Sequence, residues 1–338
     1  MTKASSATSR LIHVEATELK LRRRRSGDGF TFLKARGGVI RDKTTIARLR
    51  RLAVPPAYEH VRYAENPLAH IQAIGQDAAG RRQYRYHAQW DEVRERRKAG
   101  HLAELIRLLP KLRAAISRHL STNEPTRDFA LAAVIDLIAA TAIRAGSEAY
   151  AREHGTRGAA TLLKTDVTIK GDQVALHFRG KGGKDIEKTF RSARLARSLR
   201  KLKQLPGKRL FQYRNADGVI AKVRRRDVNS FLQEITSDQV TLKDFRTLIA
   251  CGCALAELSA LDPKPSERGR RKQVVEALRS VAEELANTPA VCRKSYVHTA
   301  IVGAFESGDL AKMTRNTSLR SASARERLLS QMLRRLSN

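Results

Sequence analysis

A charged run at residues 91–100 separates two stretches of this chain whose apolar residues follow different periods. Before it, short alternating runs are interrupted by glycine, a pattern typical of strands. After it, apolar residues recur at helical spacing, as at 102–112 and 131–138. A chain of 338 residues is long enough for two domains, each with its own core. We therefore expect a β-rich domain at 1–92, a linker at 93–100, a larger domain at 101–318 and a C-terminal helix or tail at 319–338.

The local patterns indicate an α+β fold with a small mainly-β N-terminal domain and a larger mainly-α domain. Residues 70–87 read as a β-hairpin, and residues 42–50 as a short capped helix. Three strand-like runs at 167–170, 174–178 and 186–190 predict a three-stranded β-sheet inside the helical domain. Pro110 is expected to break or kink the first long helix of that domain.

The formal net charge of +32 indicates a polyanionic partner, because such self-repulsion exceeds what solubility requires. Nucleic acid is the first candidate and an acidic membrane surface the second. The longest apolar stretch, 129–143, contains Asp136, so no spanning segment is expected. The Ser/Thr-rich start, Met1–Arg10, lacks the apolar core of a secretion signal, although an organelle transit peptide stays open.

The cysteines are too few and too irregularly spaced for a disulfide framework or a four-ligand zinc site, which fits a reducing cytoplasm. They are Cys251, Cys253 and Cys292.

Tyr296 lies after a helix break at Asn287-Thr288-Pro289. A tyrosine has an ordinary pKa of about 10 and needs cationic neighbours to act as a nucleophile. Arg144 follows an apolar stretch, so its side chain either reaches outward or is held in a buried pocket by an anion. Lys181 occupies a glycine-flanked turn that lacks the pattern of a phosphate-binding P-loop. Taken singly, each of these residues is more often structural than catalytic.

Together these motifs resemble those of type IB DNA topoisomerases. The segment 285–298 resembles the one that carries the DNA-attacking tyrosine, and 144–150 resembles the motif Arg-x-Gly-x-Glu-x-Tyr, with Ser147 where many members have asparagine. Lys243-Asp244-Phe245-Arg246-Thr247 resembles the signature Lys-Asp-Leu-Arg-Thr. The resemblance implies that Tyr296 is the nucleophile, Arg144 and Arg246 clamp the phosphate, and Lys181 is the general acid. Asn287 stands where many members use histidine and would donate one neutral hydrogen bond.

Gln83-Tyr84-Arg85-Tyr86 resembles a DNA-contacting segment of the poxvirus-type enzymes, with Arg85 where an aromatic residue is usual. Strand alternation places Tyr84 and Tyr86 on one face and Gln83 and Arg85 on the other. The alternative is that both tyrosines pack in the core of a small β domain. The implied DNA-binding residues are Gln83, Tyr84, Tyr86 and Lys243.

The resemblance implies a bacterial, poxvirus-like enzyme that relaxes supercoiled duplex DNA through a 3′-phosphotyrosyl intermediate, strand swivelling and religation. It implies no ATP, no metal and no other cofactor, and a cytoplasmic monomer that clamps duplex DNA in the nucleoid without a membrane. A tyrosine recombinase is the nearest alternative, but its second arginine usually follows a histidine at minus three, where this chain has Lys243. A non-catalytic basic nucleoid-binding protein would explain the charge but not the ordered motifs.

Overall fold

The computed structural model describes residues 11–237, 240–315 and 317–337, so the expectation for Met1–Arg10 lies outside the described residues. The chain divides after Arg96 into two compact units. The segment 93–100, expected as the linker, is helical and lies inside α2, Trp90–Leu120. Among the described helices, none has both the length and the apolar composition needed to cross a membrane.

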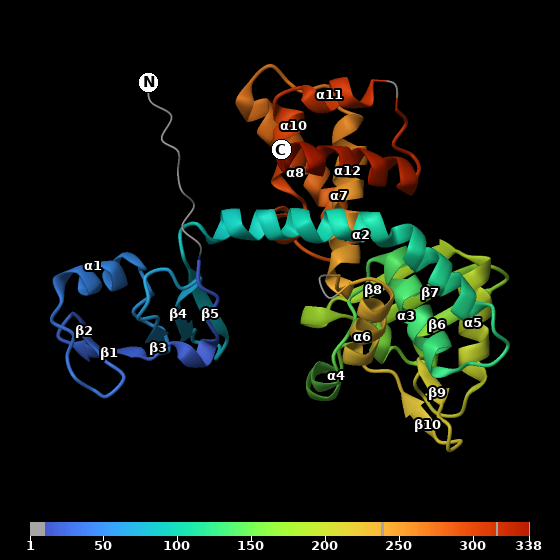
Figure 1. The fold of residues 1–338 in the computed structure, drawn as a ribbon, viewed down its shortest axis with the longest axis horizontal. Coiled ribbons are helices and arrows are strands. Elements are labelled where there is room, and N and C mark those ends of the chain that lie inside the picture. Colours follow the sequence, from blue (N-terminus) through green and yellow to red (C-terminus); the bar gives the residue numbers. More distant parts are fainter. Residues whose placement is uncertain (1–10, 238–239, 316, 338) are drawn as a thin grey trace. The chain divides into compact units, whose positions relative to one another are not determined.

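The first unit is a five-stranded antiparallel sheet with one covering helix (Figure 1). Its strand order is β2-β1-β3-β4-β5. Leu21, Phe32, Leu49 and Tyr63 are buried together between the sheet and helix α1. The Asp42 side chain caps α1 by accepting a hydrogen bond from Thr45 N at 2.6 Å. The elements are η1 Ala16–Glu18, β1 Leu21–Ser26, β2 Gly29–Leu33, α1 Lys43–Arg51, β3 Glu59–Tyr63, β4 Ile71–Gln76 and β5 Arg82–Tyr86.

The second unit is mainly helical and contains the predicted three-stranded sheet, in the order β6-β7-β8. A second, two-stranded sheet of β9 and β10 was not predicted, because each strand has only three residues. The helices after α2 are α3 Arg127–Thr141, α4 Glu148–His154, α5 Ala193–Gln204, α6 Arg225–Ile235, α7 Leu242–Ser259, α8 Glu267–Glu284, α9 Pro289–Ser295, α10 Thr299–Glu306, α11 Asp309–Thr314 and α12 Ala322–Ser337. The strands and short 3₁₀ turns are η2 Ala159–Thr161, η3 Lys164–Asp166, β6 Val167–Lys170, β7 Gln173–Arg179, η4 Lys181–Gly183, β8 Asp185–Arg191, β9 Gln212–Arg214 and β10 Ile220–Lys222.

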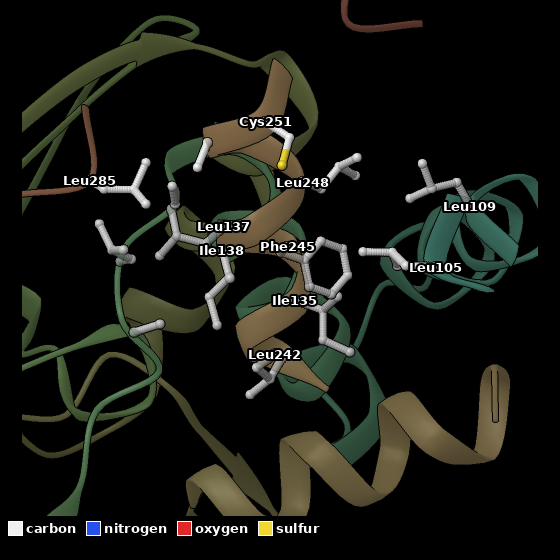
Figure 2. Packing of buried hydrophobic residues seen from close by; sticks show 14 of the residues in the cluster. Leu105, Leu109, Ile135, Leu137, Ile138, Leu242, Phe245, Leu248, Cys251 and Leu285 are labelled. Atoms are coloured by element: carbon white, nitrogen blue, oxygen red, sulfur yellow. The ribbon is translucent and has the colours of Figure 1, made fainter. Parts of the chain in front are cut away.

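Helices α3 and α7 form the centre of the second unit. Most residues of α3 are buried, as expected for a helix that is apolar on all sides. Helix α7 packs against α3, α8 and α12, and Figure 2 shows Phe245 and Leu248 on the side that faces Leu105 and Leu109 of α2. Truncating the buried Phe245 to alanine would cost about 3–5 kcal/mol. The packing therefore fixes α7 firmly, and with it the residue that follows Phe245.

Pro110 was expected to break or kink its helix. It does not end the helix, because α2 continues to Leu120. A proline inside a helix removes one backbone hydrogen bond. The buried leucines on both sides of it, Leu105, Leu109 and Leu112, hold the two halves against the same core. Tertiary burial thus outweighs the local cost.

Candidate active site

Arg246 lies in the second turn of α7 and is 4% exposed. A capping box between Thr241 and Asp244 begins this helix. The guanidinium donates to the carbonyl oxygen of Ala142 and, at 3.0 Å, to that of Leu285. Across the described chain, it forms no ion pair with a carboxylate. A buried cation whose partners are neutral groups, with no carboxylate among them, is a strong site for an incoming anion.

Each carbonyl group that accepts from Arg246 is at or next to an alanine whose backbone is in the left-handed conformation. Ala142 ends α3 with a φ of 54°, and Ala286, next to Leu285, has a φ of 47°. Residues other than glycine seldom adopt this conformation, and its cost is commonly found at functional sites. These two turns aim the carbonyl groups at Arg246.

Tyr296 follows α9, which begins at Pro289 with Thr288 as its N-cap. Arg246 Nε donates to Tyr296 Oη at 3.4 Å, and the guanidinium carbon lies 5.1 Å from the ring centroid. Backbone bonds from the amides of Tyr296 and Val297 to Cys292 O, at 3.0 and 2.9 Å, fix the end of α9. The hydroxyl is therefore held beside a guanidinium, as a nucleophile for a phosphate requires.

Arg144 lies just after α3 in a loop that packs closely against residues 158–160. The amide of Ala159 donates to Arg144 O at 2.8 Å, and that of Ala160 to Ala145 O at 2.9 Å. A Cβ at Gly158 would overlap Arg144 O and the backbone of Gly146, so only glycine permits this approach. The loop therefore fixes the backbone from which the Arg144 side chain extends.

Asn287 lies between α8 and α9 and contacts Arg144. Arg144 Nη2 donates to Asn287 Oδ1 at 2.6 Å. The Nδ2 of Asn287 is buried and has no hydrogen-bond partner among the described residues. A buried donor without an acceptor is costly, so this amide is ready to donate to a bound group.

Lys181 is exposed at the tip of the turn between β7 and β8, where Gly182 and Gly183 have φ values of 75° and 74°. It lines the same cavity of about 500 Å³ as Arg144, Arg246 and Tyr296. Lys243 also lines this cavity and is exposed. The structure therefore brings together four of the five predicted catalytic side chains around one cavity, and Asn287 joins them through Arg144.

The electrostatics of the cavity favour an anion. Of the fifteen described residues that line it, six are Lys or Arg and none is acidic. Burial raises the pKa of Tyr296, but the charges of Arg246, Arg144 and Lys243 and the hydrogen bond from Arg246 outweigh this, so the pKa lies below its ordinary value of 10.0. Burial, and then the charge of Arg246, lower the pKa of Arg144. The same cations thus favour both a phenolate and a phosphate.

Two further arginines line the cavity and were not singled out from the sequence. Arg157 donates to Asp166 Oδ1 at 2.7 Å, and Arg225 is exposed at the start of α6. The net positive charge of 224–235 indicated a phosphate-facing surface there, but no local pattern distinguished Arg157 from other loop arginines. Across residues 11–237, 240–315 and 317–337, no three His, Cys, Asp or Glu side chains are grouped so that they could hold a metal ion.

The predicted DNA-binding residues of the first unit lie on β5. The strand register pairs Tyr84 with Ile74 and Gln83 with Gly75, so the tyrosines and Gln83 lie on opposite faces. Tyr84 and Tyr86 are 39% and 42% exposed and stack at 6.0 Å, so they do not lie in the core. Gln83 is half-buried, and its amide donates to Asp77 Oδ2 at 2.9 Å. The two tyrosines are thus available to a partner, whereas the Gln83 amide is already engaged.

Arginines on neighbouring strands lie on the same face of the sheet as Tyr84 and Tyr86. Arg22 pairs with Arg62, Arg62 with Ile74, and Ile74 with Tyr84 across neighbouring strands. Directly paired residues share a face. We call this surface the open face, with Arg22, Arg24, Arg62, Arg82, Tyr84 and Tyr86 as its members. Its exposed arginines and aromatic rings suit contacts with a phosphate backbone.

A helical unit that assembles a tyrosine, two arginines and a lysine around a basic cavity defines a class of proteins that break and rejoin DNA through a tyrosine. Topoisomerases and recombinases both belong to this class. Residues 87–320 match the family described as "Eukaryotic DNA topoisomerase I, catalytic core", and residues 29–77 match "Bacterial DNA topoisomerase IB, N-terminal domain".

Several viral proteins are similar over most of the chain. The "DNA topoisomerase 1B" of Acanthamoeba polyphaga mimivirus is 32% identical over 283 residues, which are 81% of this chain and 84% of the viral protein. The "DNA topoisomerase 1B" of Vaccinia virus (strain Copenhagen) is 23% identical over 243 residues, or 70% of this chain and 73% of its own. The "DNA topoisomerase I" of Monkeypox virus is equally similar, at 23% over 243 residues.

The chain belongs to the type IB DNA topoisomerase family. It is an isomerase whose substrate is DNA, and relaxation without ATP is typical of the family. The predicted family is therefore confirmed, and the recombinase and the non-catalytic binder are set aside.

Proposed function

We propose that Tyr296 is the nucleophile with which this enzyme cleaves one DNA strand. Its oxygen attacks a backbone phosphorus, the bond from phosphorus to the 5′ oxygen breaks, and a 3′-phosphotyrosyl link forms. Religation reverses these steps after the free 5′ end has swivelled. The depressed pKa of Tyr296 supports this role, because it raises the fraction of phenolate near neutral pH.

Arg144 and Arg246 stabilise the charge that develops on the nonbridging phosphate oxygens. Two guanidinium groups can each offer paired donors to these oxygens. Neither has a carboxylate partner among the described residues, so a phosphate supplies the anion that the site lacks. The unpartnered Asn287 Nδ2 adds one neutral donor.

Lys181 supplies the proton to the departing 5′ oxygen, and Arg144 assists it. An ammonium group on a glycine turn at the rim of the cavity can reach a leaving group on the far side of the phosphorus from Tyr296. The scheme requires no metal ion.

The DNA is held by further contacts with its backbone. Lys243 and Arg225 contribute at the cavity, and Tyr84 and Tyr86 contribute from the open face of the first unit. We propose that one monomer clamps the duplex between its two domains, at 1–92 and 101–318, and acts on the bacterial nucleoid in the cytoplasm. Affinity then falls steeply with salt, because bound phosphates release counterions.

The observation that carries this proposal is the placement of Tyr296 Oη beside a buried, uncompensated Arg246. The test is relaxation of supercoiled plasmid in EDTA without ATP, with wild type and Tyr296→Phe compared. Relaxation by the wild type alone, with equal DNA binding by both proteins, is expected. Relaxation by Tyr296→Phe would remove this residue from the nucleophile role, and loss of relaxation from the wild type in EDTA would show that a metal is needed.

A further inference from the structure

The four residues Glu284–Asn287, which we call the α8-end segment, contact both arginines of the site and the hairpin that carries Lys181. Leu285 O accepts from Arg246, and Asn287 Oδ1 accepts from Arg144. The same segment reaches the hairpin that carries Lys181. Lys184 Nζ donates to Asn287 O at 3.4 Å, and Lys188 Nζ forms an ion pair with Glu284 Oε1 at 2.8 Å.

The turn that carries Lys181 has little freedom relative to its own hairpin. Gly180 N donates to Lys184 O at 2.7 Å and Gly183 N to Gly180 O at 3.1 Å, which closes the turn. Strands β7 and β8 are paired along their whole length, from Gln173 with Arg191 to Arg179 with Asp185. The location of Lys181 in the cavity therefore depends on where the hairpin as a whole is held.

The ion pair between Lys188 and Glu284 is the stronger of the two contacts between the hairpin and the α8-end segment. The Lys188 side chain is 18% exposed and that of Glu284 is 41% exposed, so the pair is partly shielded from solvent. Both residues line a crevice of about 20 Å³ together with Lys181, Arg144 and Arg246. This volume is close to that of one water molecule, so the hairpin and the α8-end segment pack closely against each other there.

We propose that Lys188 and Glu284 are positioning residues that set Lys181 at the correct distance from the leaving oxygen. Neither touches the reacting atoms. The ion pair joins the hairpin that carries the general acid to the α8-end segment, which includes Asn287 and contacts both arginines. A proton donor displaced by about 1 Å loses much of its effect, so this link should govern leaving-group protonation more than attack by Tyr296.

This inference rests on the proposed role of Lys181 as the general acid. A substrate with a different leaving group can test the positioning role of the ion pair separately from that acid role. When the 5′ bridging oxygen of a synthetic duplex is replaced by sulfur, the leaving group is a thiolate. A thiol has a pKa of about 8.5, far below that of an alcohol, so its departure does not need a proton. A defect that arises only from a misplaced or missing general acid therefore disappears with the sulfur substrate.

The experiment measures single-turnover cleavage of the oxygen and sulfur substrates by Glu284→Lys, Lys188→Glu/Glu284→Lys and Glu283→Lys. Glu283→Lys is the matched control, because it makes the same change of charge one residue away at an exposed position. We expect Glu284→Lys to slow cleavage of the oxygen substrate about tenfold or more while cleaving the sulfur substrate at nearly the wild-type rate. The control should resemble the wild type on both substrates, and the double swap should recover most of the loss.

Several outcomes would overturn the proposal. Equal rates for Glu284→Lys and Glu283→Lys would show that the ion pair positions nothing. An equal loss on both substrates would show a general structural defect instead, as would a double swap no faster than Glu284→Lys. Lys181→Ala is measured in parallel. If the sulfur substrate does not restore cleavage by this variant, Lys181 is not the general acid. If it does, a negative result with Glu284→Lys contradicts only the role of the ion pair.

Discussion

Arg144 and Asn287, which are 143 residues apart in the sequence, are joined by a hydrogen bond of 2.6 Å from guanidinium Nη2 to amide Oδ1. The bond occupies the amide oxygen and leaves Nδ2, buried and unpartnered, as the only group of this side chain that can donate. Asn287 thus contacts Arg144 through its oxygen and, in the proposed mechanism, a bound phosphate through its nitrogen, and substitutions at this position can test both contacts.

Asn287→Asp should impair cleavage more than Asn287→Ala does. Alanine removes one neutral hydrogen bond, worth about 1 kcal/mol or roughly a fivefold change in rate. Aspartate would instead place a carboxylate against Arg144, which neutralises that cation and repels the phosphate, so we expect a loss of about 100-fold or more. Single-turnover cleavage measures both. Wild-type cleavage by Asn287→Ala would contradict the proposed donor role, and an Asn287→Asp variant no slower than Asn287→Ala would contradict the proposed effect of the charge.

Arg144→Ala should raise the pKa of Tyr296. The pKa lies below 10.0 partly because Arg144 is positively charged, so removing this charge makes the phenolate less favourable. The titration of Tyr296 should then move to higher pH. It can be followed by tyrosinate absorbance, with the Tyr296→Phe form of each protein subtracted to remove the other tyrosines. A titration that stays in place would mean that Arg144 does not act on the phenol.

Gly158→Ala should destabilise the second unit and reduce cleavage together. Its new Cβ would overlap Arg144 O and the backbone of Gly146, so the loop must shift, at a cost of about 1–3 kcal/mol. Gly303→Ala is the control, since it has open space around it and lies inside α10. That change should stabilise the helix by up to about 1 kcal/mol and leave cleavage unchanged. Chemical denaturation and cleavage assays distinguish the two, and wild-type behaviour of Gly158→Ala would show that the loop can move freely.

Arg62→Ala should weaken DNA binding and make it less dependent on salt. If Arg62 neutralises one phosphate, its loss reduces the slope of log affinity against log salt by about 0.9. Arg25→Ala is the comparison, because Arg25 is also exposed but pairs with Phe30 on the opposite face of the sheet. Binding titrations at several salt concentrations give both slopes. Equal slopes for the two variants would remove the open face from the DNA-binding surface.

The sequence was most informative where a local pattern determines structure. The β4–β5 hairpin, the Asp42 cap and the three-stranded sheet follow from alternation, capping residues and glycine turns, and all are present. The continuation of α2 through Pro110 was missed, because the packing that offsets a proline comes from distant residues.

The site shows the same division. The motifs around Arg144, Arg246 and Tyr296 indicated which residue types to expect, and the structure brings these three side chains together around one cavity. Their partners were not predictable: the Ala142 and Leu285 carbonyls, Arg157, and the ion pair of Lys188 with Glu284 all depend on tertiary proximity. A local pattern contains no information about which distant backbone atom will face a side chain.

The carbonyl groups that hold Arg246 have a consequence for the enzyme without DNA. A carboxylate partner would titrate and would compete with the substrate, whereas a backbone carbonyl has neither a proton to gain nor a net charge to offer. The two carbonyl groups therefore leave the positive charge of Arg246 without a neutralising partner among the described residues. In the proposed mechanism a phosphate of the DNA backbone supplies the missing negative charge, so the substrate itself neutralises Arg246 when it binds.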